Sequence, residues 1–163
     1  MVFEILVGKL PLEICIYAEP FLVQLPDKDE YYTFSLQALL WLEKYNQLND
    51  YNLTLTMDWA AHQNDLDVVK WLHYNHTEGC TTNAMDDAAA GGHLDIVRFL
   101  HENRTEGCTT YAMDSAAFNG NLDTIRFLHE NRAEGCTTIA MDKASFNGYL
   151  EVVRFLHENR TEG

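Results

Sequence analysis

The sequence predicts an all-α solenoid, in which pairs of short helices stack in single file behind an N-terminal helical cap. The main observation is a segment, Gly92–Arg104, that recurs at a constant interval as Gly120–Arg132 and Gly148–Arg160. Apolar residues within each copy follow the spacing of a helix that buries one side. A strict repeat of this kind is typical of proteins in which each unit buries its apolar side against the next. The chain is also 47% apolar, which is enough for a continuous core.

Residues 1–56 carry no complete copy of the repeat. From Thr33 onward the apolar residues follow a helical stripe, and the segment 36–42 is similar to the segment 66–72 of the first regular unit. Terminal units of a solenoid are expected to be atypical, because they cover the core on one side only. We therefore expect residues 1–56 to form a helical cap that contains the second half of a degenerate repeat.

The regular part of the chain, residues 57–163, divides into four units: 57–84, 85–112, 113–140 and a shorter 141–163. Each unit is predicted to contain two helices. In the third unit the first helix spans residues 110–118, where a Thr side chain can accept a hydrogen bond from a free N–H group at the helix start. Gly120 ends this helix and lets the chain turn. The second helix then spans residues 122–131.

The second helix of each unit has an apolar side and a charged side. In the second unit, Val97 and Leu100 lie on the apolar side, whereas Asp95, Arg98 and Glu102 lie on the other. The spacing of the charged residues predicts surface ion pairs, each worth only about 0.3–0.5 kcal/mol. We interpret this side as a solvated face rather than as a binding site.

The charge of the chain limits its partners. The net charge is −14, from 25 acidic and 11 basic residues. Nucleic acids and anionic membrane surfaces are bound mainly through Lys and Arg, so we expect neither as a partner. A basic partner, or a role of the charge in solubility alone, fits better. The sequence also contains no apolar run long enough to cross a membrane.

Three of the four cysteines, Cys80, Cys108 and Cys136, occupy the same place in successive units. Stacked helices lie about 8–10 Å apart, whereas the Cα atoms of bridged cysteines lie within about 7 Å. We therefore expect free thiols, which indicate a reducing compartment. The protein is accordingly predicted to be intracellular and cytoplasmic.

Histidine and aspartate form two further ladders with one residue per unit, and we expect neither to bind a metal or catalyse a reaction. Rungs about 10 Å apart cannot share one ion, and a carboxylate repeated in every unit does not indicate one unique cleft. The histidines are predicted to fill the stack or to contact helix C-termini, and the carboxylates to lie near helix starts. We predict no cofactor, no metal and no enzymatic activity. The ladders are His73, His101, His129 and His157, and Asp58, Asp86, Asp114 and Asp142.

The second unit contains the motif Gly92–Leu100 (GHLDIVRFL), preceded by Ala88-Ala89. This motif resembles the ankyrin-repeat pattern G-H-L-x-V-V-x-x-L, and the two alanines resemble the preceding A-A-x-x-G. The resemblance covers residues 57–163 and recurs four times in register. It implies a protein-binding scaffold without enzymatic activity.

The units depart from the family pattern in two ways. The usual T-P-L-H is replaced by N-A-M-D, Y-A-M-D and I-A-M-D, starting at residues 83, 111 and 139. The 28-residue period, counted from Gly92 to Gly120, is also shorter than the family's period of about 33 residues. The missing residues fall between Arg104 and Cys108, where the family has a projecting β-hairpin. The chain therefore resembles the short, hairpin-poor variety of ankyrin repeat found in protists and large DNA viruses, and we expect its partner binding not to use long loops.

Positions that vary between units indicate a candidate binding face, because residues required for stacking should be the same in every unit. In the third unit the varying positions 111, 115, 118 and 119 have the spacing of one helix stripe. Aromatic residues are over-represented at binding hot spots. We hypothesise that this stripe of the first helices binds a partner protein, through Trp59, Asp87, Tyr111, Ser115, Phe118, Lys143, Phe146 and Tyr149.

Two alternative functions stay open at this point. Leu10–Ile14 (LPLEI) resembles the opening of an F-box, which implies a substrate adaptor that docks onto a ubiquitin ligase through residues 10–26. The second alternative is an enzyme without a recognisable site. The last unit stops before the Cys-Thr-Thr that would start another, so we also expect a fragment of a longer array or weak self-association through an uncapped C-terminal repeat.

Overall fold

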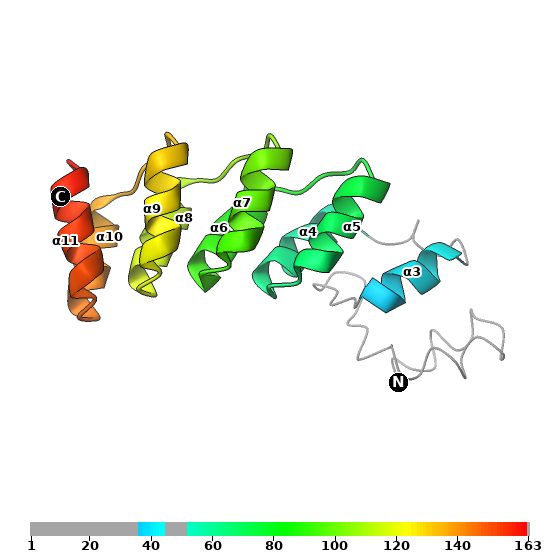
Figure 1. The fold of residues 1–163 in the computed structure, drawn as a ribbon, viewed down its shortest axis with the longest axis horizontal. Helices are drawn as coiled ribbons and strands as arrows, with labels where there is room; N and C mark the ends of the chain where they lie inside the picture. The colour runs from blue at the N-terminus through cyan, green and yellow to red at the C-terminus, as the bar shows by residue number, and fades with distance from the viewer. Residues whose placement is uncertain (1–35, 45–51, 163) are drawn as a thin grey trace.

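The computed structural model describes residues 36–44 and 52–162, and this part of the chain is α-helical without strands. Helix α3, Leu36–Lys44, is followed by four helix pairs that lie side by side along the long axis of the molecule (Figure 1). The predicted all-α solenoid is therefore confirmed. The pairs are α4 (Leu53–His62) with α5 (Leu66–Asn75), α6 (Thr82–Gly91) with α7 (Leu94–Asn103), α8 (Thr110–Phe118) with α9 (Leu122–Asn131), and α10 (Thr138–Phe146) with α11 (Leu150–Asn159).

The helices form two rows that are packed to different degrees. The first helices of the pairs, α4, α6, α8 and α10, contact one another extensively along the stack, whereas the second helices approach one another at only a few points. Small core residues explain the close row, because Ala112, Ala116 and Ala117 of α8 are buried and let neighbouring backbones approach. The second helices contribute larger core residues, such as Ile125 and Leu128 of α9, which fill the space between the rows.

Local signals set the helix ends, as the sequence predicts. The Thr109 side chain accepts a hydrogen bond from the N–H of Tyr111 at the start of α8, and Gly120 takes a φ of 77° after that helix. Glycine adopts this left-handed conformation at the least steric cost. The bounds of α8 and α9 agree with the predicted 110–118 and 122–131.

Helix α3 lies beside α5, as α5 lies beside α7, so it takes the place of a second helix at the N-terminal side of the stack. Leu39 and Leu42 of α3 are buried and join the common core. Residues 10–26, which carry the F-box-like start, lie outside the described residues.

The charged side of the second helices differs from the prediction. Among the described residues, the expected ion pair forms only in α11, between Arg154 and Glu151 at 3.2 Å. Arg98 lies instead over the ring of Phe127 in the next pair, with its guanidinium carbon 4.8 Å from the ring centre, and Arg126 makes the same contact one unit later. The prediction considered one helix alone, whereas these cation–π contacts cross between neighbouring helices.

Three members of the histidine ladder, His73, His101 and His129, pack against the next unit, as one of the two sequence interpretations predicts, whereas His157 is exposed. The ring of His101 meets that of Phe127 edge-on, with 5.5 Å between ring centres, and His129 meets Phe155 in the same way. Phe127 and Phe155 are therefore each covered by an arginine and a histidine of the preceding unit.

Candidate functional site

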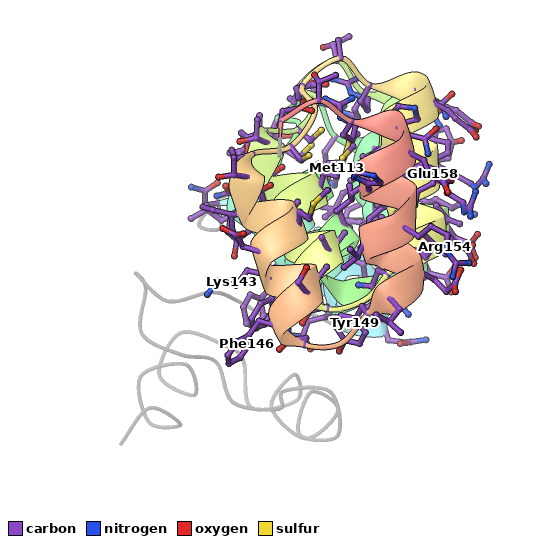
Figure 2. All side chains as sticks on the ribbon, turned by 90° about the vertical axis from the view of Figure 1, so that its left-hand side faces the viewer. Met113, Lys143, Phe146, Tyr149, Arg154 and Glu158 are labelled. Carbon is purple, nitrogen blue, oxygen red and sulfur yellow. The ribbon has the colours of Figure 1, made fainter. Side chains whose placement is uncertain are left out.

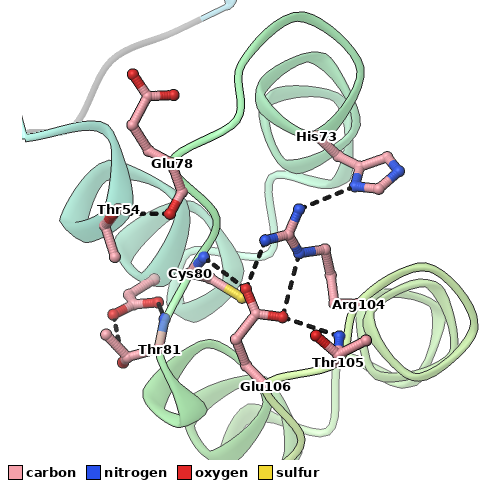
Figure 3. Close-up of polar contacts among 9 residues, drawn as sticks. Thr54, His73, Glu78, Cys80, Thr81, Arg104, Thr105 and Glu106 are labelled. Carbon is pink, nitrogen blue, oxygen red and sulfur yellow. Dashed lines mark hydrogen bonds and ion pairs between the residues drawn. The ribbon is translucent and has the colours of Figure 1, made fainter.

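An Arg–Glu ion pair closes the return loop that follows each of the second helices α7, α9 and α11. Glu106 accepts hydrogen bonds from Arg104, at 2.5 Å from Nη2 and 3.3 Å from Nε, and from the N–H of Cys80 at 3.1 Å (Figure 3). Arg104 Nη1 also lies 3.4 Å from His73 Nδ1. Because Cys80 and His73 belong to the preceding unit, these side chains join two successive loops. The Arg–Glu pair is repeated by Arg132 with Glu134 and by Arg160 with Glu162.

The surroundings of Glu106 keep it ionised. Burial alone would raise its pKa, but hydrogen bonds from Arg104 and from the Cys80 N–H outweigh burial and lower the pKa to about 2. Gly79 lies beneath the Arg104 guanidinium, so a Cβ at that position would clash with Nη2. The loop between Arg104 and Cys108 contains only Thr105, Glu106 and Gly107, too few residues for a projecting hairpin.

The thiols lie behind these ion pairs. Cys80, Cys108 and Cys136, the cysteine ladder, are buried and free, as predicted, whereas Cys15 lies outside the described residues. Burial raises the pKa of Cys80 to about 12 and that of Cys108 to about 11. Because the thiolate is the nucleophile, these cysteines are suited to packing rather than to chemistry.

The aspartate ladder links consecutive first helices. Asp86 of α6 accepts hydrogen bonds from the N–H and the hydroxyl of Thr109, both at 2.8 Å. Burial raises the pKa of Asp86, against the lowering effect of these hydrogen bonds. The carboxylate thus acts on the start of the next helix rather than on its own, and both of its oxygens are engaged. The same contacts join Asp58 to Thr81 and Asp114 to Thr137.

Side chains in the turn between paired helices contact the preceding unit. Asn119 and Asn121 donate hydrogen bonds to the carbonyl oxygen of Ala90, at 3.0 and 2.8 Å. Tyr149 lies over Gly120, where an added Cβ would be 2.8 Å from the ring. These positions vary between units and yet contact the stack, so variation alone does not separate recognition from packing.

The aromatic members of the predicted binding stripe lie on an exposed face. Tyr111 and Phe118 of α8 are 56% and 46% exposed, and Phe146 of α10 is 86% exposed. Figure 2 shows Lys143 and Phe146 on the side of α10 that points away from α11. Tyr149 is 39% exposed and lies in the turn that follows α10.

The other members of the predicted stripe differ in exposure. Asp87 of α6 and Ser115 of α8 are half-buried, whereas Lys143 is exposed. Trp59 of α4 is half-buried, and its ring centre lies 5.0 Å from that of His62. The stripe therefore crosses all four first helices, and its charged members lie on α6 and α10.

The same face contains two exposed residues outside the predicted binding set, Leu55 of α4 and Ile139 of α10, which are 40% and 50% exposed. Both occupy the repeat position of Tyr111 in other units, so the period itself contains the signal. We call the whole surface the first-helix face: Leu55, Trp59, Asp87, Tyr111, Ser115, Phe118, Ile139, Lys143 and Phe146.

The opposite surface, formed by the second helices, is charged. Arg154 and Glu158 point away from α10 (Figure 2). A groove of about 430 Å³ between α9 and α11 is lined by side chains of both signs, including Arg126, Glu130 and Glu151. Its charged walls contrast with the apolar side chains of the first-helix face.

The described ranges, 36–44 and 52–162, contain neither a metal site nor a membrane-spanning helix. No group of three or more His, Cys, Asp or Glu side chains is arranged there to hold a metal ion. None of the helices in those ranges combines the length and the apolar character needed to span a membrane.

Comparison with known proteins gives one match. The family described as ankyrin repeats (many copies) matches residues 57–101, 85–129 and 113–157, which together span more than half of the chain. No curated protein and no solved structure matches the chain. Ankyrin repeats are in general protein–protein interaction modules, and the family is typically non-enzymatic. Repeated helix pairs, a strict period and this match agree, and the chain belongs to the ankyrin-repeat family.

Proposed function

We propose that the chain is a non-enzymatic scaffold that binds a partner protein on its first-helix face. The observation that supports this most directly is a row of exposed large apolar side chains. Tyr111, Phe118, Ile139 and Phe146 are 56%, 46%, 50% and 86% exposed. Exposed apolar residues that gather on one face are typical of interaction sites, and aromatic residues are enriched among the residues that dominate binding energy.

The second helices support the proposal by contrast. Tyr74 of α5 and Leu150 of α11 are exposed, but the other large apolar side chains of the second helices, such as Ile125 and Leu128, are buried or half-buried, and Phe155 is covered by Arg126 and His129. A partner that binds through apolar contacts therefore finds more accessible area on the first-helix face.

Affinity capture tests the proposal with one double variant and one control. Protein carrying Tyr111→Ala and Phe118→Ala should retain the fold but lose the captured partner. Tyr74→Ala is the matched control, because Tyr74 is 69% exposed and lies on α5, in the row of second helices. Circular dichroism checks that both variants fold. Equal capture by the wild type and the double variant would remove the proposal.

Weak self-association is a second element of the proposal. Phe146 and Leu150 on the last helix pair are 86% and 73% exposed, and exposed apolar side chains of this size favour association. Light scattering over a range of protein concentrations measures it. A strict monomer at high concentration, or association that Phe146→Ala and Leu150→Ala leave unchanged, would contradict it.

A further inference from the structure

We infer that the first-helix face binds a protein segment with a fixed order of charge: a basic residue over α6, apolar residues over α8, and an acidic residue over α10. The inference rests on the proposed function and adds the chemistry of the partner. Its basis is the repeat position shared by Asp87, Ser115 and Lys143, which occurs once in each of three neighbouring helices.

Asp87 is the carboxylate that α6 offers to a partner. Its neighbour Asp86 is buried and accepts two hydrogen bonds from Thr109. The Asp87 side chain is 39% exposed, and its nearest basic group is His62, with 3.9 Å between Oδ2 and Nδ1. That distance is at the limit for an ion pair, so Asp87 is available to a basic side chain of the partner.

Lys143 provides the opposite charge at the other end of the row. It is exposed, and Figure 2 shows it beside Phe146 on the side of α10 that points away from α11. Among the described residues, Lys143 forms no ion pair. An acidic side chain of the partner is therefore complementary to this end of the face.

The middle of the row is uncharged. Ser115 lies between Tyr111 and Phe118 on α8, and both rings are about half exposed. Burying a charged group against these rings would be unfavourable without a counter-ion, whereas an apolar side chain gains from covering them. The three helices thus present acidic, apolar and basic surfaces in that order.

The spacing of the helices fixes the length of the segment. Neighbouring packed helices lie about 8–10 Å apart, so Asp87 and Lys143, two units apart, are separated by roughly 16–20 Å. An extended chain advances about 3.3–3.6 Å per residue and covers this distance in about five or six residues. A helix, with a rise of about 1.5 Å per residue, needs about 11–13 residues.

The inference is tested by selection from a displayed library of random 16-residue peptides. A length of about 16 residues accommodates either an extended or a helical segment. Binders of the wild-type chain should share an apolar block with a basic residue on one side and an acidic residue on the other. Charge reversal by Asp87→Lys should weaken those binders at least about tenfold at low salt. Changing the basic residue of the peptide to Glu should restore binding to that variant. Lys143→Glu should show the mirror-image pattern with the acidic residue of the peptide.

Two controls separate this inference from the proposed function. Glu102→Lys changes the net charge by the same amount as Asp87→Lys, on an exposed residue of α7 in the row of second helices, and should not affect the binders. Binders that depend on Tyr111 and Phe118 but are indifferent to both charge reversals would overturn the inference and leave the proposed function intact. If no binder depends on Tyr111 and Phe118, the proposed function itself fails.

Discussion

The contact between Asp86 and Thr109 offers a direct test of how neighbouring units hold together. Replacing Asp86 with Ala removes the acceptor of two hydrogen bonds, both 2.8 Å long. Asp142 occupies the equivalent position in α10, where it is exposed and has no such contact within the described residues. Asp142→Ala is therefore a matched control that changes the same residue type at the same helix position.

We expect Asp86→Ala to lower the free energy of unfolding by about 2–3 kcal/mol. A hydrogen bond to a charged acceptor contributes about 1.5–3 kcal/mol, and impairing the capping hydroxyl of Thr109 adds up to about 1 kcal/mol. Part of this loss is returned, because Asp86 is only 4% exposed and a buried carboxylate is costly to desolvate. Asp142→Ala should change the free energy of unfolding by less than about 0.5 kcal/mol.

Urea unfolding followed by far-ultraviolet circular dichroism measures both effects. Each unit contacts only its neighbours, so weakening the contact between α6 and α8 should also broaden the transition and lower its slope against urea. Asp86→Asn retains one carbonyl acceptor and removes the buried charge, so it should cost less than Asp86→Ala. Equal destabilisation by Asp86→Ala and Asp142→Ala would refute the reasoning, because only the first removes a contact between units.

Three further predictions concern the loops and turns. Glu106→Gln should lower the free energy of unfolding at neutral pH by about 1–2 kcal/mol after allowance for solvent screening. The pKa of Glu106 in the folded protein is about 2, below the ordinary value of 4.5, so its contribution to the free energy of unfolding is complete above pH 4.5 and is lost toward pH 2. Urea unfolding of the wild type and of the variant across that range measures it. A difference between the two proteins that does not change with pH would contradict the account. In a Cys15→Ser variant, the cysteine ladder should react with a disulfide reagent only as fast as the protein opens, because the three thiols are buried and inaccessible to the reagent. Burial also raises their pKa values and so lowers the thiolate fraction; immediate labelling of the native protein would contradict this. Gly120→Ala should destabilise the protein by about 1 kcal/mol more than Gly148→Ala in thermal unfolding. Both glycines have a φ of 77°, but only Gly120 faces the Tyr149 ring. Equal effects of the two substitutions would show that the ring moves aside without cost.

The helix boundaries could be predicted because they depend on local signals that recur with the period. A threonine precedes α8 and Gly120 follows it, and both residues act through the backbone of adjacent positions. The contacts between units could not be predicted in the same way. Asp86 and Thr109 are 23 residues apart, and the sequence shows that both recur without showing that they meet.

The charged side of the second helices illustrates the same limit. Within one helix, Arg98 has acidic neighbours at favourable spacing, so an ion pair is the natural expectation. The neighbouring unit brings Phe127 beneath its guanidinium, 4.8 Å from the ring centre. Burial of that ring gains more than an exposed ion pair does, so the tertiary contact replaces the local one.

The candidate face could be predicted in part from the sequence. Spacing alone places Tyr111 and Phe118 on one stripe, and the structure shows both of them exposed. Leu55 escapes the prediction because the first unit is counted from residue 57, although it lies two periods before Tyr111. Tyr149 varies between units but also covers Gly120, so its variation reflects packing as well as exposure.

Under the proposed function, the short loops restrict the contacts of a partner to the helices. The Arg104–Glu106 pair holds the return loop against Cys80 and leaves no hairpin to contact a ligand. Under that proposal, recognition is confined to a few side chains per unit on helices whose backbones are fixed by the stack. Such a surface loses little conformational entropy on binding, so its affinity depends on those side chains themselves. A partner that fits the aromatic rings of α8 but carries the wrong charge over Asp87 should therefore be rejected rather than accommodated, because no loop can move to relieve the conflict.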